Sequence, residues 1–396
     1  MKLNTVKLLL PVIAITMQSN SASTLIPPFL QHLNIPVAGI GTLISLGPIL
    51  ALASRLPVGL AYNHGRARLL IAAAVVAMGI TNYCYSFAVD SLSFAVVHCL
   101  NGFAYGAVTT LYMAFYVDSL APDENRNHAM GYYVGSLAVG YSTGNFFGGL
   151  IADYFGYGMT FQLAALLSLI PCALLWLLRG AGGAAVGKAK AKAKLTVKGI
   201  WNAILEPGLA TVVVTALFLN LLHQMSGVFV SLYGLAVGMS LTQIGVIRAA
   251  YAGVNAVTRP ISGHVVDRFG HRGLSFTGIP LQSALLMLIP LFTGFGAILT
   301  VYLCSGLLRA IVIVANAVGL VQDVDETKVQ RGVASAVYNS AGDLGNILGP
   351  TIGGLIAQAT SIGSVFVVGS LASTIMFVVA LWAVKFANQD RGVGPA

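Results

Sequence analysis

The chain has 396 residues, of which 57% are hydrophobic and 8% are charged, and its mean hydropathy is +0.84. A water-soluble protein of this length needs more polar surface than that composition provides, so the surrounding medium must be lipid. The formal net charge of +9 would also suit a nucleic-acid-binding protein, and the positions of the basic residues decide between the two interpretations.

Apolar runs of about 20 residues recur along the whole chain, and each can cross a hydrocarbon core of about 30 Å as a helix. The sequence therefore predicts an all-α integral membrane protein with twelve transmembrane helices. The expected spans are 8–30, 38–61, 69–89, 93–117, 129–152, 158–178, 208–233, 243–266, 273–293, 297–321, 333–357 and 363–386. The start of the first span resembles a signal peptide, but apolar sequence resumes at Leu25.

Basic residues occupy alternate connections between these spans. If the N-terminus is cytoplasmic, the inside segments carry Lys2, Lys7, Arg66, Arg68, Arg126, Arg179, Lys188, Lys190, Lys192, Lys194, Lys198, Arg268, Arg272, Lys328, Arg331, Lys385 and Arg391, and the outside loops carry none. This bias predicts that both termini face the cytoplasm. The net positive charge is therefore explained by the orientation of the chain in the membrane, and no nucleic-acid partner is expected.

The two halves of the chain repeat each other at an offset of about 205 residues. Matched residues include Arg126, Tyr133, Gly140, Gly144 and Gly148 in the first half and Arg331, Tyr338, Gly345, Gly349 and Gly353 in the second. The repeat predicts two pseudo-symmetric six-helix bundles, residues 1–179 and 208–396, joined by a cytoplasmic linker, residues 180–207. The lysines of the linker could hold anionic headgroups, but a plain flexible connection is favoured.

The chain resembles the major facilitator superfamily over essentially its whole length. The most specific element is the loop that runs from Gly263 to Arg272 and includes Asp267, Arg268 and Gly270, because it closely matches the family's glycine-x-x-x-aspartate-arginine-x-glycine-arginine pattern. The counterpart that begins at Gly59 is one residue shorter and carries Asn63 in place of the aspartate. The resemblance implies alternating access between two bundles and residence in a bacterial inner membrane.

The resemblance also implies a set of residues that control the conformation. They are Gly59, Arg66, Arg68 and Asp118 in the first half and Gly263, Asp267, Arg268, Arg272, Asp323, Gly349 and Pro350 in the second. The arginines would reach the aspartates that close the fourth helix of each half. The alternative is that these charges only anchor helix ends at the interface. Asn145 stands where the family's antiporters usually carry proline, which weakens an inference of export.

Solute is expected near the membrane midplane, where polar side chains are costly and therefore functional candidates. The resemblance places the first and fourth helices of each half around this cavity. The candidates are Gln18, Asn20, His98, Asn101, Tyr105, Asn220, His223, Gln224, Arg309 and Asn316. His98 and His223 could instead be hydrogen-bonded packing residues.

Arg309 is the strongest of these candidates. It lies 14 residues before Asp323, which is about 21 Å from the helix end and too deep for the side chain to reach the interface. Asp343 is the acid placed well inside a span, and it could pair with Arg309 either structurally or as a proton-coupled switch. His98, His223 and Asp343 are therefore the candidates for proton coupling.

Two transport hypotheses remain open at this point. The first is proton-coupled export of an amphipathic or drug-like compound, and the second is uptake or facilitated diffusion of a small organic anion. A sensor or scaffold without transport activity would need a larger soluble region than these loops provide. Nucleophile–base pairs, metal clusters and phosphate-binding loops are absent from the sequence, so we expect no enzyme activity and no cofactor. The partners expected are a small solute, protons and the bilayer, and the chain is expected to be monomeric.

Overall fold

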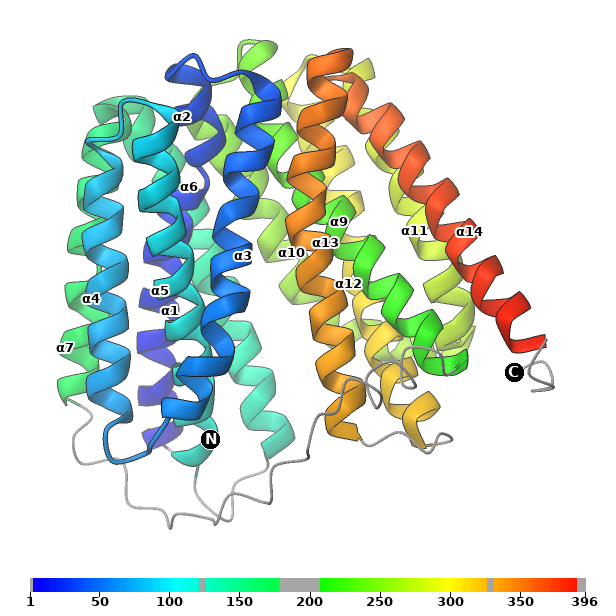
Figure 1. Cartoon of the computed structure of the whole chain (residues 1–396), viewed down its shortest axis with the longest axis horizontal. Coiled ribbons are helices and arrows are strands. Elements are labelled where there is room, and N and C mark those ends of the chain that lie inside the picture. The colour runs from blue at the N-terminus through cyan, green and yellow to red at the C-terminus, as the bar shows by residue number, and fades with distance from the viewer. Residues whose placement is uncertain (1–2, 121–125, 178–206, 326–330, 390–396) are drawn as a thin grey trace. The chain divides into compact units, whose positions relative to one another are not determined.

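The computed structural model describes residues 3–120, 126–177, 207–325 and 331–389, and all the regular elements within these ranges are helices (Figure 1). Residues 180–206 of the expected linker and the side chain of Asp323 lie outside what is described. The helices of the first half are α1 (Leu3–Ser23), α2 (Ile26–His32), α3 (Val37–Ala61), α4 (Ala67–Tyr85), α5 (Ser91–Asp118), α6 (Arg126–Leu166) and α7 (Leu169–Leu177). The second half contains α9 (Pro207–Ala236), α10 (Leu241–Phe269), α11 (His271–Met287), η2 (Ile289–Leu291), α12 (Phe295–Asp325), α13 (Arg331–Ala359), η3 (Val365–Gly369) and α14 (Ser370–Gln389).

Nine segments of the described chain are long and apolar enough to cross a membrane. One of them, residues 128–177, is 50 residues long and covers two of the expected spans. Helices α10 and α13 occupy the positions of two further expected spans but are not among the nine. Both are interrupted by glycine and by charged or amide side chains, such as Arg248 and Asp343, which lower their hydropathy. The all-helical membrane class predicted from the sequence is confirmed.

The long element α6 reverses direction at Gly156. This residue has φ 79° and ψ 173°, a backbone conformation that a residue with a Cβ rarely adopts. The chain can therefore end one membrane-spanning helix near Phe155 and begin the next at Tyr157 without a longer loop. The predicted boundary between the fifth and sixth spans falls at this turn.

The chain divides into two compact units, which we describe separately. The first comprises residues 1–188 and 234–256, and the second comprises residues 189–233 and 257–396. In the first unit α1 packs along α6, and α5 packs against both α3 and α4 (Figure 1). Apolar side chains from α1, α4 and α5, among them Leu8, Val75 and Phe115, form its core. The division into bundles 1–179 and 208–396 remains a prediction.

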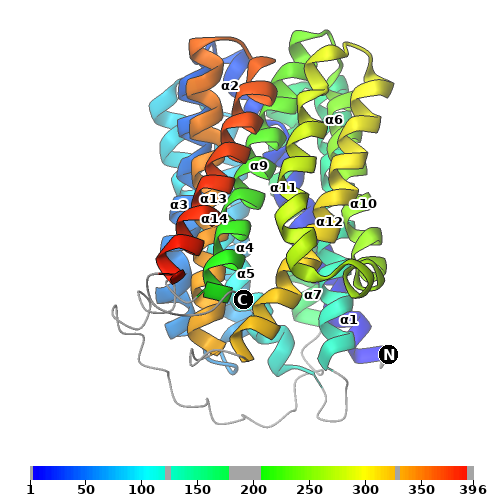
Figure 2. The same cartoon turned by 90° about the vertical axis from the view of Figure 1, so that its right-hand side faces the viewer.

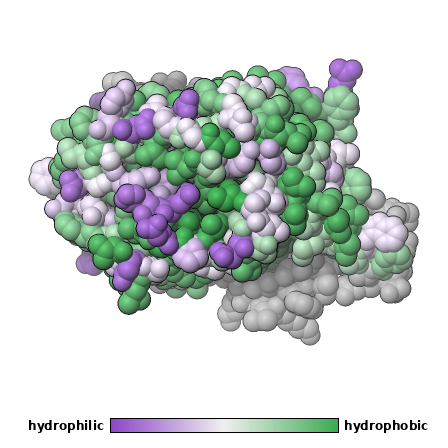
Figure 3. Space-filling view, turned by 90° about the horizontal axis from the view of Figure 1, so that it is seen from above, coloured by the Kyte–Doolittle hydropathy of each residue, from purple (hydrophilic) through white to green (hydrophobic). Residues whose placement is uncertain are grey.

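In the second unit α11 packs against α12 and α14, and α13 contacts α12 (Figure 2). Its largest fully buried side chains include Phe229, Tyr302, Phe366 and Phe377. Seen from the end at which α2 lies, hydrophilic residues gather in patches between hydrophobic ones (Figure 3). Such a mixture is expected where helices leave the hydrocarbon and enter the headgroup region.

Glycines bring the fifth helix of each half into backbone contact with the first. A Cβ added at Gly144 of α6 would lie 2.5 Å from the carbonyl oxygen of Met17 on α1. The matched residue of α13, Gly349, would place a Cβ 2.5 Å from the carbonyl oxygen of Leu221 on α9. Any side chain at either position would push the two backbones apart.

Candidate solute-binding residues

His98 is held between α3, α4 and α5 and is 8% exposed. Its Nδ1 lies 2.7 Å from the hydroxyl of Tyr85, and its Nε2 lies 3.2 Å from the carbonyl oxygen of Ile44. A carbonyl oxygen only accepts hydrogen bonds, so we assign the ring proton to Nε2 and the accepting lone pair to Nδ1. The ring also stacks on Phe94, with centroids 5.2 Å apart. Both nitrogens of His98 are therefore used by the neutral form of the ring.

Asn101 and Tyr105 follow His98 along α5 and are half-buried. The Asn101 amide donates to Thr81 Oγ1 at 2.8 Å and to Asn82 Oδ1 at 3.1 Å, both on α4. The Tyr105 hydroxyl lies 3.4 Å from the hydroxyl of Tyr141 on α6. The polar side chains of α5 are thus bound to neighbouring helices of the same unit.

The polar residues of α1 divide between its two sides. Gln18 is 0% exposed, and neither atom of its carboxamide has a hydrogen-bond partner. Asn20 is half-buried and donates to the carbonyl oxygen of Thr16 at 3.0 Å. Helix α1 packs along α6 and also contacts α7, and the Tyr112 hydroxyl of α5 donates to the carbonyl oxygen of Leu8 at 2.7 Å. Gln18 is therefore a residue of the unit's interior.

Arg309 connects α12 to α9 and is 7% exposed. One terminal nitrogen of its guanidinium donates to the carbonyl oxygen of Leu219, and the other donates to Asn220 Oδ1 at 3.0 Å. The Asn220 amide donates in turn to the carbonyl oxygen of Ala216 at 2.8 Å. These two acceptors are neutral, and together they fix the orientation of the guanidinium.

Further polar groups of the second unit lie close to this arginine. Tyr338 on α13 has Asn316, Arg309 and Arg259 as polar neighbours. Asn316 is 1% exposed and donates to the carbonyl oxygen of Val212 at 3.1 Å. The structure thus brings together Arg309, Asn220 and Asn316, three of the candidates predicted from the sequence.

The remaining candidates of this unit lie on α9 and α13. His223 and Gln224 are half-buried on α9, one turn after Asn220, and Asp343 is half-buried on α13. The pairing of Asp343 with Arg309 stays a prediction, as does the role of each histidine in proton coupling.

The end of α5 is tied to the loop that follows α3. Asp118 Oδ2 accepts a hydrogen bond from the Tyr62 hydroxyl at 2.8 Å and lies 3.9 Å from His64 Nδ1. Loss of solvation on burial, and next the bond to Asp118, raise the pKa of Tyr62 well above its usual range. The Arg68 guanidinium lies over the ring of Phe115, 5.6 Å from its centroid. The loop therefore contacts α5 through Tyr62 and His64, and Arg68, at the start of α4, contacts it through Phe115.

The corresponding loop of the second half is more open. Asp267, Arg268 and Arg272 are exposed, and the Arg268 guanidinium lies 5.6 Å from the ring centroid of its neighbour Phe269. In the described chain no atom lies within 4 Å of a Cβ built on Gly263, and the nearest to one on Gly59 is a methyl group 3.8 Å away. The conformational role of these residues and of Arg66 stays a prediction.

The first part of α10 belongs to the first unit and packs on α6. The Asn145 side chain accepts a hydrogen bond from the Thr24 hydroxyl and donates to the carbonyl oxygen of Arg248 at 3.4 Å. The carboxylate of Asp153 accepts from the backbone N–H and the hydroxyl of Thr242, at 3.3 and 2.7 Å, and so caps the start of α10. Asn145 thus links α6 to α10 and to the turn between α1 and α2, at the position where the second half has Pro350.

Sequence reasoning missed several of these partners. Tyr85, Tyr141 and Tyr62 complete hydrogen bonds of predicted residues, but each lies on a different helix or in a loop, so no spacing rule connects them. Tyr338 could have been identified from the sequence, because the internal repeat matches it to Tyr133. Within the described residues no group of three or more His, Cys, Asp or Glu side chains could hold a metal ion.

Comparisons with known proteins agree with this architecture. A model of the Major Facilitator Superfamily matches residues 8–328. An uncharacterized MFS-type transporter of Methanocaldococcus jannaschii is 21% identical over 332 residues, which are 83% of this chain and 84% of that protein.

Solved structures show the same fold. A bacterial homolog of the human lysosomal transporter Spinster has 15% identity and a TM-score of 0.77, with 98% of this chain and 96% of that chain covered. The nucleoside transporter NupG has 14% identity and a TM-score of 0.76, with 98% and 99% covered.

Proposed function

The chain belongs to the major facilitator superfamily, whose members are secondary transporters of small solutes and not enzymes, and we propose that its solute is a small organic anion bound by Arg309. The observation that carries this proposal is that Arg309, a residue inside a membrane-spanning segment, is only 7% exposed. An ionised group at that depth is costly, and such residues usually serve the transported solute or its coupling ion.

The surroundings of Arg309 suit a carboxylate or a similar planar anion. Its contacts with Leu219 and Asn220 fix the plane of the guanidinium, and a fixed plane favours binding of a carboxylate through two parallel hydrogen bonds. Arg259 adds a second positive charge near Tyr338. By contrast, the predicted polar residues of the first unit are neutral amides, hydroxyls and a neutral imidazole.

A binding experiment tests the charge of the solute. Purified protein is heated with a panel of small carboxylates and with the matching neutral amides, because a ligand at 100 times its Kd stabilises the native state by about 2.7 kcal/mol. We expect at least one carboxylate to raise the Tm of the wild type and of Lys7→Gln, an exposed charge-removal control. The same carboxylate should leave the Tm of Arg309→Gln unchanged. Equal stabilisation by the neutral amide, or an unchanged shift in Arg309→Gln, would contradict the proposal.

Proton-coupled export of an amphipathic compound is the second candidate, and the half-buried Asp343 on α13 favours it. Both ring nitrogens of His98 are used in hydrogen bonds. Asp343 and His223 are the other two residues that the sequence offers for carrying a proton in this mechanism. Transport into proteoliposomes, measured with and without a pH gradient, distinguishes proton-coupled transport from transport that is not coupled to protons. Equal rates under the two conditions would exclude the proton-coupled mechanism, and Asp343→Asn should abolish any dependence that is found.

We also propose that both chain ends face the cytoplasm of a cell with an inner membrane. The support is the one-sided distribution of Lys and Arg along the sequence. Cysteines introduced near the two ends should react with an impermeant reagent only after the membrane is opened. Labelling of one end in intact cells would contradict this topology.

A further inference from the structure

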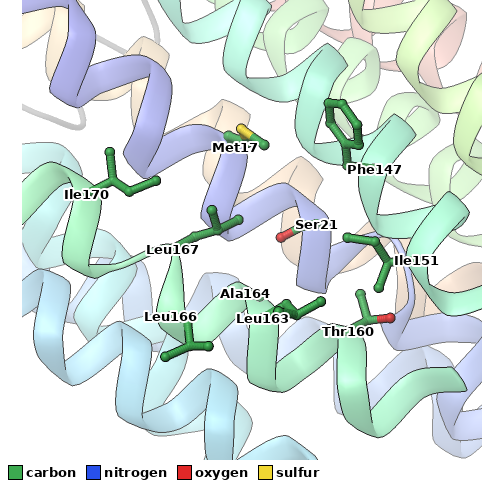
Figure 4. A pocket seen from close by; sticks show the side chains of 10 residues that line it. All are labelled: Met17, Ser21, Phe147, Ile151, Thr160, Leu163, Ala164, Leu166, Leu167 and Ile170. Atoms are coloured by element: carbon green, nitrogen blue, oxygen red, sulfur yellow. The ribbon is translucent and has the colours of Figure 1, made fainter. Parts of the chain in front are cut away.

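A groove of about 400 Å³ runs between α1, the two parts of α6 on either side of Gly156, and α7 in the first unit (Figure 4). That volume lies within the range of about 300–1,000 Å³ that is usual for small-molecule sites. Met17 and Ser21 line it from α1, Phe147, Ile151 and Thr160 from α6, and Ile170 from α7. None of the solute-binding candidates lines this groove, so it is separate from the residues around Arg309.

The groove offers no free polar group to an occupant. The Ser21 hydroxyl donates to the carbonyl oxygen of Gln18, and the Thr160 hydroxyl donates to that of Gly156, each at 2.9 Å. The other lining side chains are hydrocarbon or thioether. Water is therefore a poor occupant, because a bound water needs two to four polar partners.

The rim of the groove is open to the membrane. Phe147, Leu166 and Ile170 are 40%, 59% and 47% exposed, and all three lie within one of the membrane-spanning segments. The medium at that depth is lipid hydrocarbon. The neighbouring molecules with the matching chemistry are therefore acyl chains.

The length of the groove matches one leaflet. From Thr160 to Ile170 the chain advances ten residues, or about 15 Å of helix, which is half of a hydrocarbon core of about 30 Å. Beyond the Thr160 end lies the turn at Gly156, where Tyr154 and Phe155 are 78% and 67% exposed. Exposed aromatic side chains are typical of the membrane–water interface. The groove therefore reaches from the interface to the midplane.

We propose that this groove is a specific binding site for one acyl chain of a bilayer phospholipid. The lipid belongs to the leaflet on the Gly156 side, its headgroup lies beside Tyr154, and its chain extends along α6 and α7 towards Met17. Occupation of this site fills the gap between α1 and α7 that protein side chains leave.

Photolabelling with phosphatidylethanolamine that carries a diazirine in one acyl chain tests the site. In detergent micelles that contain no other phospholipid, labelling of peptides from 144–151 and 160–170 should saturate as the probe concentration rises, because a specific site fills, and excess unlabelled phosphatidylethanolamine should reduce it. Labelling of the exposed face of α4, around Leu69 and Val76, should rise in proportion to the probe. Proportional labelling at the groove peptides would overturn the proposal.

Two variants identify the groove as the origin of the saturable labelling. Leu163→Trp fills the groove, and Leu169→Trp places the same side chain on the exposed face of α7, outside the lining. We expect the saturable component to disappear in the first variant and to persist in the second. If Leu163→Trp fails to fold, Ile151→Phe tests the same prediction with a smaller change. Saturable labelling that persists in a folded, groove-filling variant would contradict a phospholipid site. The same holds if a soluble apolar compound competes with the probe and unlabelled phospholipid does not.

Discussion

The fourth helix of each half carries a deeply buried basic side chain, and the two are held in different ways. His98 on α5 uses both ring nitrogens for bonds to Tyr85 and Ile44, and its ring stacks on Phe94. Arg309 on α12 is held by the neutral acceptors Leu219 and Asn220. Both nitrogens of the imidazole are thus committed to packing contacts between helices, whereas the contacts of the guanidinium fix its plane. The fourth helices of the two halves therefore differ in local chemistry, and we propose that the solute binds at the second.

Both halves have a close glycine contact between their first and fifth helices, at Gly144 and at Gly349. Disrupting these contacts should have the largest effect on stability. Gly144→Ala and Gly349→Ala each place a Cβ 2.5 Å from a backbone oxygen, and overpacking of this kind costs about 1–3 kcal/mol. We expect similar losses in Tm for the two variants, measured by thermal unfolding in detergent.

Gly135→Ala is the matched control for these variants. Gly135 is exposed on α6 and has no atom of the described chain within 4 Å of a Cβ, so this change should be neutral or stabilising by up to about 1 kcal/mol. A loss in Gly144→Ala alone would show that the two halves do not pack alike.

Asn145 marks a difference between the halves, since Pro350 occupies the matching place. The bond between Thr24 and Asn145 should contribute about 0.5–1.5 kcal/mol. A double-mutant cycle with Thr24→Val and Asn145→Ala should therefore give a coupling energy of that size in thermal unfolding. Thr143→Val is a suitable control, because its hydroxyl bonds within its own helix. Strict additivity of the two changes would contradict the contact.

The smallest effect is expected at Asp90, which caps the start of α5. The Ser93 hydroxyl and backbone N–H hydrogen-bond the carboxylate and lower its pKa below the usual value of 3.8. A lowered folded-state pKa adds stability above the unfolded-state pKa, and that stability is lost as the pH falls through the folded-state pKa. Asp90→Ala should thus have a slightly lower Tm at pH 7, and its deficit should shrink in acid. A deficit that is independent of pH would contradict the capping role of the charge.

The fold was predictable from the sequence to the extent that it depends on periodicity and length. Glycines recur at a spacing of four in α6 and α13, a pattern that favours close helix contacts, and Gly144 and Gly349 each make one. The depth of Arg309 followed from counting residues to the helix end. The class of the protein follows from these local patterns, because lipid requires each span to satisfy its own backbone.

The partners of individual side chains could not be predicted in the same way. Gln18 and Asn20 are two residues apart in one polar stretch, yet Gln18 is completely buried and Asn20 is not. The glycines of α6 approach the backbone of α1, as Gly144 does at Met17, and the polar residues of α1 give no sign of this contact. The Tyr85 bond to His98 joins the end of α4 to α5, which packs beside it, and only the packed unit reveals it.

Solute flux in proteoliposomes tests most directly the proposal that Arg309, in the second half, makes the protein bind an anionic solute. For the carboxylate found in the binding panel, Arg309→Gln should reduce uptake at least about 30-fold, because truncating one partner of a buried charge pair costs about 2–5 kcal/mol. Arg309→Lys should retain part of the uptake, and His98→Gln should retain uptake with an unchanged pH profile. Normal uptake in Arg309→Gln together with loss of uptake in His98→Gln would contradict the account.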